Sequence, residues 1–298
     1  MNEMCRTSLR RRIGWLAVGV LVCILSSANA AAETTVRQQR NRVYYFIDDP
    51  RPVAAAIQEL IERYGYVITY EDPPYAYAGD IKDVTEEVRG SAPPDRAGTV
   101  PRTLIPLGGS LQWSHAVSAN TGRPESVDIA LRELLTTQEA TGTGGVFRLL
   151  RTGDVVHVIP TRVRALNGDW IQVSSILDVP ISLAPQSGPF GKMLDAFCAA
   201  VSKTAHVELD FSGFMSELFV PGGGVRIQGA TGEPARDVLS RILLAMNKRI
   251  AWVIFNAPGD KLYVLSLSFL PDIPGATPVP PKPTPAVVPD SPRPWGRH

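Results

Sequence analysis

The chain contains an internal repeat, which constrains the fold more than any single motif does. The segment Leu218–Leu244, LFVPGGGVRIQGATGEPARDVLSRILL, matches the earlier segment Leu104–Leu135, LIPLGGSLQWSHAVSANTGRPESVDIALRELL. In both segments, glycines precede a short strand-like run, and a helical pattern then ends in a Leu-Leu pair. Such self-similarity is typical of a supersecondary unit that is used more than once. The sequence therefore predicts two tandem domains of similar fold.

The residues before the first repeat segment predict the opening elements of the first domain. Arg42–Ile47 is rich in aromatic and β-branched residues, which are typical of a strand. Pro52–Tyr64 has apolar residues at helical spacing and is followed by Gly65, a favoured residue just after a helix. Tyr66–Tyr70 predicts a second strand. We expect Glu33–Asn41, which is polar, to be a frayed lead-in.

The remaining elements follow the same order in both halves. In the first half we expect short strands at Leu104–Leu107 and Ser110–Ser114, a helix near Ser126–Thr137, and a hairpin of Val146–Leu150 with Val155–Pro160. In the second half we expect strands at Ile176–Leu183, Val207–Phe211 and Val225–Gln228, helices at Phe190–Val201 and Ala235–Met246, and a hairpin of Ile250–Phe255 with Lys261–Leu267. The predicted fold class is α+β, with two tandem β-α-β-β-α-β-β units whose small sheets are each packed by two helices. Their predicted bounds are 42–163 and 176–270, with a linker at 164–175.

This pattern resembles the short N-terminal (STN) domain shared by secretins and TonB-dependent transducers. The residues that carry the resemblance are Arg51–Ile57 with Leu60-Ile61, Val225–Gly229, Ala130-Leu131 with Leu134-Leu135, and Val238-Leu239 with Leu243-Leu244. The resemblance implies the fold of that module, which has no catalytic residues to transfer. Nothing after Leu270 resembles a secretin pore or a transmembrane barrel, so channel formation is not implied.

The segment Glu71–Pro101 has no place in the minimal module. Its proline pairs and weak apolar periodicity predict a long loop with a short strand near Ile81–Val84. Tyr75 and Tyr77 are the candidate binding residues of this loop. Either they form an aromatic contact patch, or they fold back over the first helix.

Both ends of the chain differ in composition from the middle. Residues 1–30 have a basic start, an apolar run and small residues at a cleavage site, which together predict a secretory signal peptide cleaved after Ala30 or Ala32. The rival interpretation, an uncleaved anchor, needs an apolar run of roughly 20 residues. Residues 271–298 are proline-rich and predict a disordered, extended tail. That tail is a spacer or, because of its PxxP spacing, a docking motif.

The predicted export and the net charge together limit the classes of partner that we expect. The formal net charge of the whole sequence is +1, and the signal contains four arginines and one glutamate, so its removal leaves −2. A near-neutral exported chain lacks the basic surface that phosphate backbones require, so we expect no nucleic-acid partner. We expect a periplasmic or envelope-associated location and no transmembrane segment in the mature chain.

The sequence predicts no catalytic, cofactor or metal site. His115, His157 and His206 fall in different elements without the spacing of a zinc motif. Cys198 is the single cysteine after the signal, and its apolar helical surroundings predict a buried core thiol. Gly222–Gly224 could hold an anion, but its counterpart in the first repeat favours a structural turn.

We therefore expect a non-enzymatic protein-interaction or scaffold module of the bacterial cell envelope. The partner would be an envelope protein or a second copy of the chain. The alternative is a periplasmic protein that binds a small molecule or a glycan, such as peptidoglycan, with the 71–101 loop.

Overall fold

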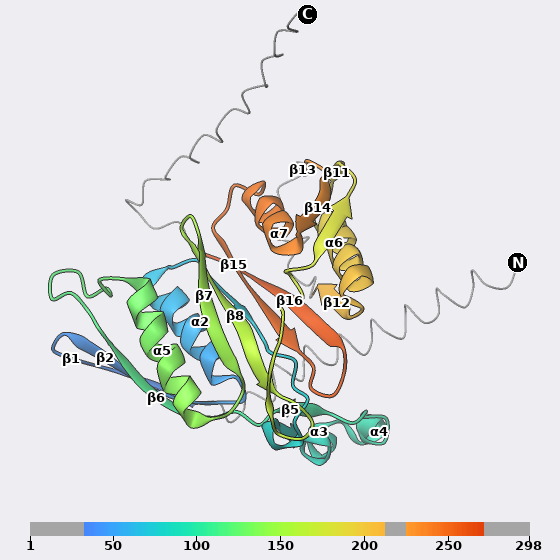
Figure 1. The fold of residues 1–298 in the computed structure, drawn as a ribbon. Coiled ribbons are helices and arrows are strands. Elements are labelled where there is room, and N and C mark those ends of the chain that lie inside the picture. Colours follow the sequence, from blue (N-terminus) through green and yellow to red (C-terminus); the bar gives the residue numbers. More distant parts are fainter. Residues whose placement is uncertain (1–32, 212–224, 271–298) are drawn as a thin grey trace, which may run out of the picture.

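A computed structural model describes residues 33–211 and 225–270, which form a mixed α+β fold (Figure 1). The predicted α+β class is therefore confirmed. The predicted signal peptide, the proline-rich tail and Gly222–Gly224 lie outside the described residues. Within the described part of the chain, no helix has the length and apolar character needed to span a membrane.

The first half of the chain alternates strands and helices. Its elements are β1 (Glu33–Gln39), β2 (Arg42–Asp49), α2 (Pro52–Tyr64), β3 (Ile68–Glu71), η2 (Ala78–Asp80), β4 (Ile81–Asp83), α3 (Thr85–Ser91), α4 (Pro94–Ala97), β5 (Leu104–Pro106), β6 (Gly109–Ala116), α5 (Val127–Thr141), β7 (Val146–Thr152), β8 (Val155–Arg164) and β9 (Trp170–Gln172). Helix α2 begins with Pro52, whose fixed φ suits a first turn, and ends at Gly65 with a φ of 65°.

The second half also alternates strands and helices, but it contains fewer elements. Its elements are β10 (Pro180–Leu183), β11 (Gln186–Gly188), α6 (Phe190–Ala205), β12 (Glu208–Phe211), β13 (Val225–Ile227), β14 (Ala230–Pro234), α7 (Ala235–Leu244), β15 (Ile250–Asn256) and β16 (Leu262–Phe269). Strands β2 and β6 pair continuously, whereas β10-β14 and β11-β13 form two separate pairs. Gly229 sits at this break, and a Cβ there would lie 2.8 Å from Pro185 Cδ.

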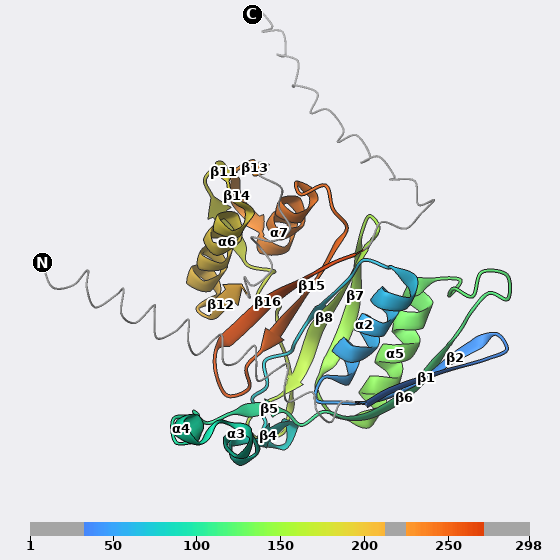
Figure 2. The same cartoon turned by 180° about the vertical axis from the view of Figure 1, so that it is seen from behind.

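A seven-stranded sheet joins the two halves. Its order is β12-β16-β15-β3-β8-β7, and β9 pairs with the end of β8. The joint is the parallel pair β15-β3, in which Val253 lies opposite Tyr70 and Ile254 opposite Glu71. Ala251 belongs to the core under α2 and α5, and its neighbour Trp252 belongs to the core under α6 and α7. Successive strand residues point to opposite faces, so the two helix pairs cover opposite faces of this sheet (Figures 1 and 2).

A second, three-stranded sheet of order β1-β2-β6 completes the first half. Its inward side chains share one hydrophobic core with α2, α5 and the central sheet. Helices α2 and α5 therefore lie between two sheets, and the outer face of the small sheet is left for solvent. The candidate site described below lies on this outer face.

Several predicted elements need correction. Glu33–Asn41 is not a frayed lead-in, because Glu33–Gln39 pairs residue by residue with β2. The prediction failed because this edge strand packs only one apolar residue, Val36, against the core and is otherwise polar. The insertion Glu71–Pro101 contains the short strand expected near Ile81–Val84, but also helices α3 and α4, which the sequence analysis missed. The strand expected at Ile176–Leu183 is confined to Pro180–Leu183.

Candidate functional site

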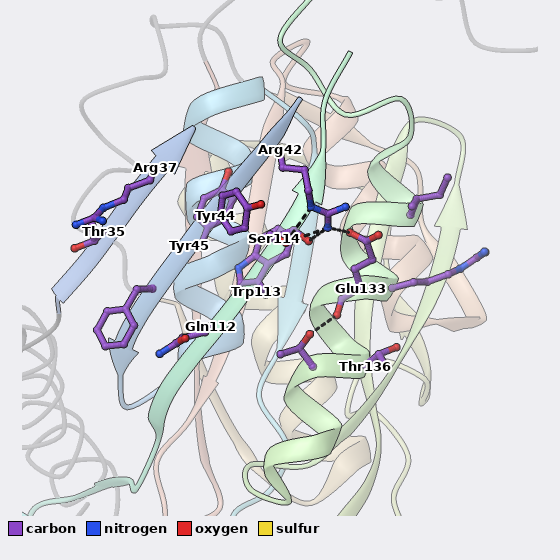
Figure 3. Close-up of a pocket in the computed structure, with 14 residues that line it drawn as sticks. Thr35, Arg37, Arg42, Tyr44, Tyr45, Gln112, Trp113, Ser114, Glu133 and Thr136 are labelled. Carbon is purple, nitrogen blue, oxygen red and sulfur yellow. Dashed lines mark hydrogen bonds and ion pairs between the residues drawn. The ribbon is translucent and has the colours of Figure 1, made fainter. Parts of the chain in front are cut away.

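A trough of about 1070 Å³ lies between the outer face of the β1-β2-β6 sheet and the exposed flank of α5 (Figure 3). Residues of β2 alternate between core and surface, so Arg42, Tyr44 and Phe46 point outward. The strand register places Arg37 of β1 opposite Tyr44, and Tyr44 opposite Ser114 of β6. The floor of the trough is therefore an ordered row of side chains that crosses three strands.

Apolar side chains contribute exposed surface to this trough. Tyr44 is 43% exposed, Phe46 is 37% exposed, and Ile129 on α5 is 52% exposed. The outer face of a two-faced antiparallel sheet is ordinarily polar. An apolar centre on this face therefore offers a surface that a ligand could cover.

Helix α5 forms the wall of the trough. Ile129, Arg132, Glu133 and Thr136 line the trough at spacings that place them on one flank of the helix. Arg42 connects this wall to the floor: its Nη2 donates to Ser114 Oγ at 2.9 Å and lies 3.9 Å from Glu133 Oε2. Figure 3 shows Arg42 and Ser114 of the sheet beside Glu133 of the helix.

A buried aromatic cluster supports the floor. Tyr45 stacks on Trp113 with ring centroids 4.6 Å apart and an interplanar angle of 9°. His115 Nε2 lies 3.3 Å from the Tyr45 hydroxyl and 3.4 Å from the Tyr64 hydroxyl. Burial lowers the pKa of His115, which favours its neutral form. These contacts hold the strands beneath the trough in one arrangement.

Two arginines of the trough lack partners within the described residues. Glu133 Oε2 has no hydrogen bond but lies within ion-pair distance of Arg42. The indole Nε1 of Trp113 also has no hydrogen bond, but it is buried on the core side of β6. Arg37 and Arg132 also make no ion pair or hydrogen bond with the residues that the structure describes. Together with Arg42 and Glu133, these arginines give the trough a formal charge of about +2.

The two tyrosines predicted as binding residues lie elsewhere and make internal contacts. Tyr75 is half-buried, its hydroxyl donates to Asp72 Oδ1 at 3.4 Å, and burial raises the pKa of Tyr75 well above its usual value. A cavity of about 20 Å³ lies beside it. Tyr77 covers the guanidinium of Arg164 at 4.6 Å from the ring centroid. Whether either residue also binds a ligand stays a prediction.

The end of β3 carries a second polar cluster, which joins the two halves. Glu71 forms a buried ion pair with Arg236 of α7, and Arg236 also contacts Ser175 Oγ at 3.0 Å. The next residue, Asp72, accepts from Arg51 Nε at 2.6 Å and from the backbone N–H of Asn256 at 3.0 Å. Burial acts to raise the pKa of the Glu71 carboxyl, and the Arg236 cation opposes that shift. Since every charge here has a partner, the cluster serves the fold.

His157 lies near this junction, in the middle of the central sheet. Its Nδ1 lies 2.8 Å from Thr69 Oγ1, and its ring centroid is 5.9 Å from that of Trp252. Burial lowers the pKa of His157 to about 4, and the nearby Arg236 cation acts in the same direction. Within the described residues, no three His, Cys, Asp or Glu side chains come together as a possible metal site. Cys198 is buried as predicted, and burial raises the pKa of its thiol.

Sequence reasoning missed the trough, although one signal was present. The strand RVYYFI has aromatic residues on both of its faces, because Tyr44 and Phe46 alternate with Tyr45. A half-exposed strand ordinarily carries polar residues on its outer face. No sequence pattern indicates that Arg37 and Arg132 line the trough, because only the fold brings them beside this strand.

Comparison with known proteins gives no relative for this chain: no family model, curated protein or solved structure matches it. The resemblance to the STN module therefore stays a prediction. Any functional conclusion must rest on the chemistry of the site.

Proposed function

We propose that the protein is an exported, non-enzymatic interaction module of the bacterial cell envelope, and that the trough is its binding surface. Export is inferred from the predicted signal peptide. The envelope partner is inferred from the resemblance to the STN module. The single observation that supports binding is the trough itself, where exposed aromatics lie beside arginines that have no partner among the described residues.

The shape of the trough favours a macromolecular partner. Sites for small molecules are enclosed and typically occupy about 300–1,000 Å³. This trough is open to solvent along the sheet and slightly larger, at about 1070 Å³. An extended partner could lie along it and contact both the sheet and α5.

The alternative, a glycan or small-molecule site under the 71–101 loop, has less support. The cavity beside Tyr75 measures only about 20 Å³, which is room for about one water molecule. Tyr75 and Tyr77 are also engaged with Asp72 and Arg164.

Site-specific photo-crosslinking tests the proposed function. A photoreactive amino acid replaces Tyr44 in the trough or, as a matched control, the exposed Arg96 on α4, in cells that export the protein. We expect an envelope protein to be crosslinked from position 44 and not from position 96. Equal crosslinking from both positions, or none from position 44, would contradict the proposal. A glycan adduct formed when the photoreactive amino acid replaces Tyr77 would instead favour the alternative.

A further inference from the structure

The arrangement of charge in the trough specifies the class of partner. Arg37 and Ser114 occupy the two ends of one row across β1, β2 and β6. Two strand spacings separate them, which is about 10 Å. Arg132 lies beyond β6, on the α5 wall. Basic groups therefore stand on both sides of the exposed aromatic side chains of β2, Tyr44 and Phe46.

A hydrogen-bonding group on the floor of the trough narrows the class of partner further. Gln112 points outward on β6 and lines the trough, and its side-chain amide can both donate and accept. A peptide backbone matches both roles, because each residue carries a C=O acceptor and an N–H donor. A simple anion such as phosphate can pair with the arginines, but it has no apolar group to cover the exposed rings of Tyr44 and Phe46.

We propose that the trough binds an extended acidic polypeptide segment, with carboxylates that flank one or more apolar side chains. The carboxylates pair with Arg37 and Arg132, and the apolar side chains cover Tyr44 and Phe46. The peptide backbone exchanges hydrogen bonds with the side-chain amide of Gln112. This inference rests on the proposed binding role of the trough and adds the chemistry of the partner.

The full exported chain is tested with a fluorescein-labelled heptapeptide that has glutamate at both ends and valine and leucine between. Two control peptides replace the glutamates with glutamine or lysine. Fluorescence anisotropy should show that the acidic peptide binds at least about tenfold more tightly than either control, and that added salt weakens its binding. Equal affinity for the three peptides would overturn the proposal.

Two variants locate the binding. Arg37→Glu/Arg132→Glu reverses the two charges of the trough that have no partner among the described residues, and Arg96→Glu makes the same change on α4. The first should lose acidic-peptide binding, and the second should retain it. Binding that survives Arg37→Glu/Arg132→Glu would overturn the proposal.

The outcomes separate this inference from the broader function. A crosslinked envelope protein without preference for the acidic peptide would leave the interaction role standing and reject this partner class. Tighter binding of an acidic oligosaccharide, such as oligogalacturonate, than of the acidic peptide would also reject it. Binding of the acidic peptide without any crosslink from Tyr44 would support the chemistry of the trough and contradict the envelope partner.

Discussion

The junction at the end of β3 and the trough over the β1-β2-β6 sheet use arginine in opposite ways. Arg236 and Arg51 are buried, and each contacts a carboxylate of the chain itself. Arg37 and Arg132 are exposed and make no ion pair with the described residues. A buried charge needs an internal partner because water cannot reach it, whereas an exposed charge needs none in order to fold. Burial therefore distinguishes the arginines that hold the fold from those available to a ligand.

Removal of Arg236 should have the largest effect on stability. Arg236→Leu leaves the Glu71 carboxylate buried without its cation, which typically costs about 3–5 kcal/mol. Urea denaturation should show a lower free energy of unfolding for this variant.

The matched control is the double variant Glu71→Leu/Arg236→Leu. A buried pair replaced as a whole by apolar residues is often close to neutral, so this variant should recover much of the lost stability. A loss below about 1 kcal/mol in Arg236→Leu alone would show that the junction does not depend on this pair.

Acid should weaken the same junction through His157. Its pKa is lowered to about 4 in the fold, whereas an unfolded histidine titrates near 6.5. Because the unfolded histidine binds a proton at a higher pH than the folded one, its contribution to stability is present above about pH 6.5. That contribution is lost as the pH falls toward 4. The 2.5-unit difference corresponds to a loss of about 3 kcal/mol between these pH values.

Urea denaturation at a series of pH values measures this loss. His157→Gln, which cannot become charged but can still contact Thr69, should show a shallower decline between pH 6.5 and 4. If the two proteins decline in parallel, the acid sensitivity comes from other groups.

The loop tyrosines test whether the 71–101 insertion belongs with the junction or with the trough. Tyr77→Ala removes a half-buried ring and its contact with Arg164, so we expect a loss of about 1–2 kcal/mol. Tyr75→Phe removes one hydroxyl contact to Asp72 and should cost about 1 kcal/mol or less. Neither variant should change acidic-peptide binding, because neither residue lines the trough. A specific loss of binding in Tyr77→Ala would instead support the loop as a ligand contact.

Local patterns were sufficient to predict much of the fold. Apolar periodicity located α2, α5, α6 and α7, and the repeat anticipated that both halves end in a hairpin. The sharing of one sheet could not be predicted in this way. The parallel pair β15-β3 joins strands far apart in the sequence, and neither strand carries a local signal for its partner. The polar pair Glu71-Asp72 resembled the start of a loop, although both residues are buried at this joint.

The candidate site was less predictable than the fold for a related reason. Tyr44 and Phe46 show their outward position through alternation along a single strand. Arg37 and Arg132 become their neighbours only when β1 pairs with β2 and α5 packs beside β6. Only one apolar residue of β1, Val36, packs against the core. The sequence of β1 therefore lacks the apolar pattern that would predict a paired strand.

The smallest effect on stability should come from the trough arginines. Arg37→Ser/Arg132→Ser removes two exposed charges that have no partner in the described chain, and such surface changes are usually within about ±0.5 kcal/mol. The same variant should bind the acidic peptide at least about tenfold more weakly, because both proposed ion pairs are lost. Urea denaturation and fluorescence anisotropy on one preparation measure both quantities. A stability loss above about 1 kcal/mol would show that these arginines have structural partners, and would remove the contrast with Arg236 on which the binding assignment rests.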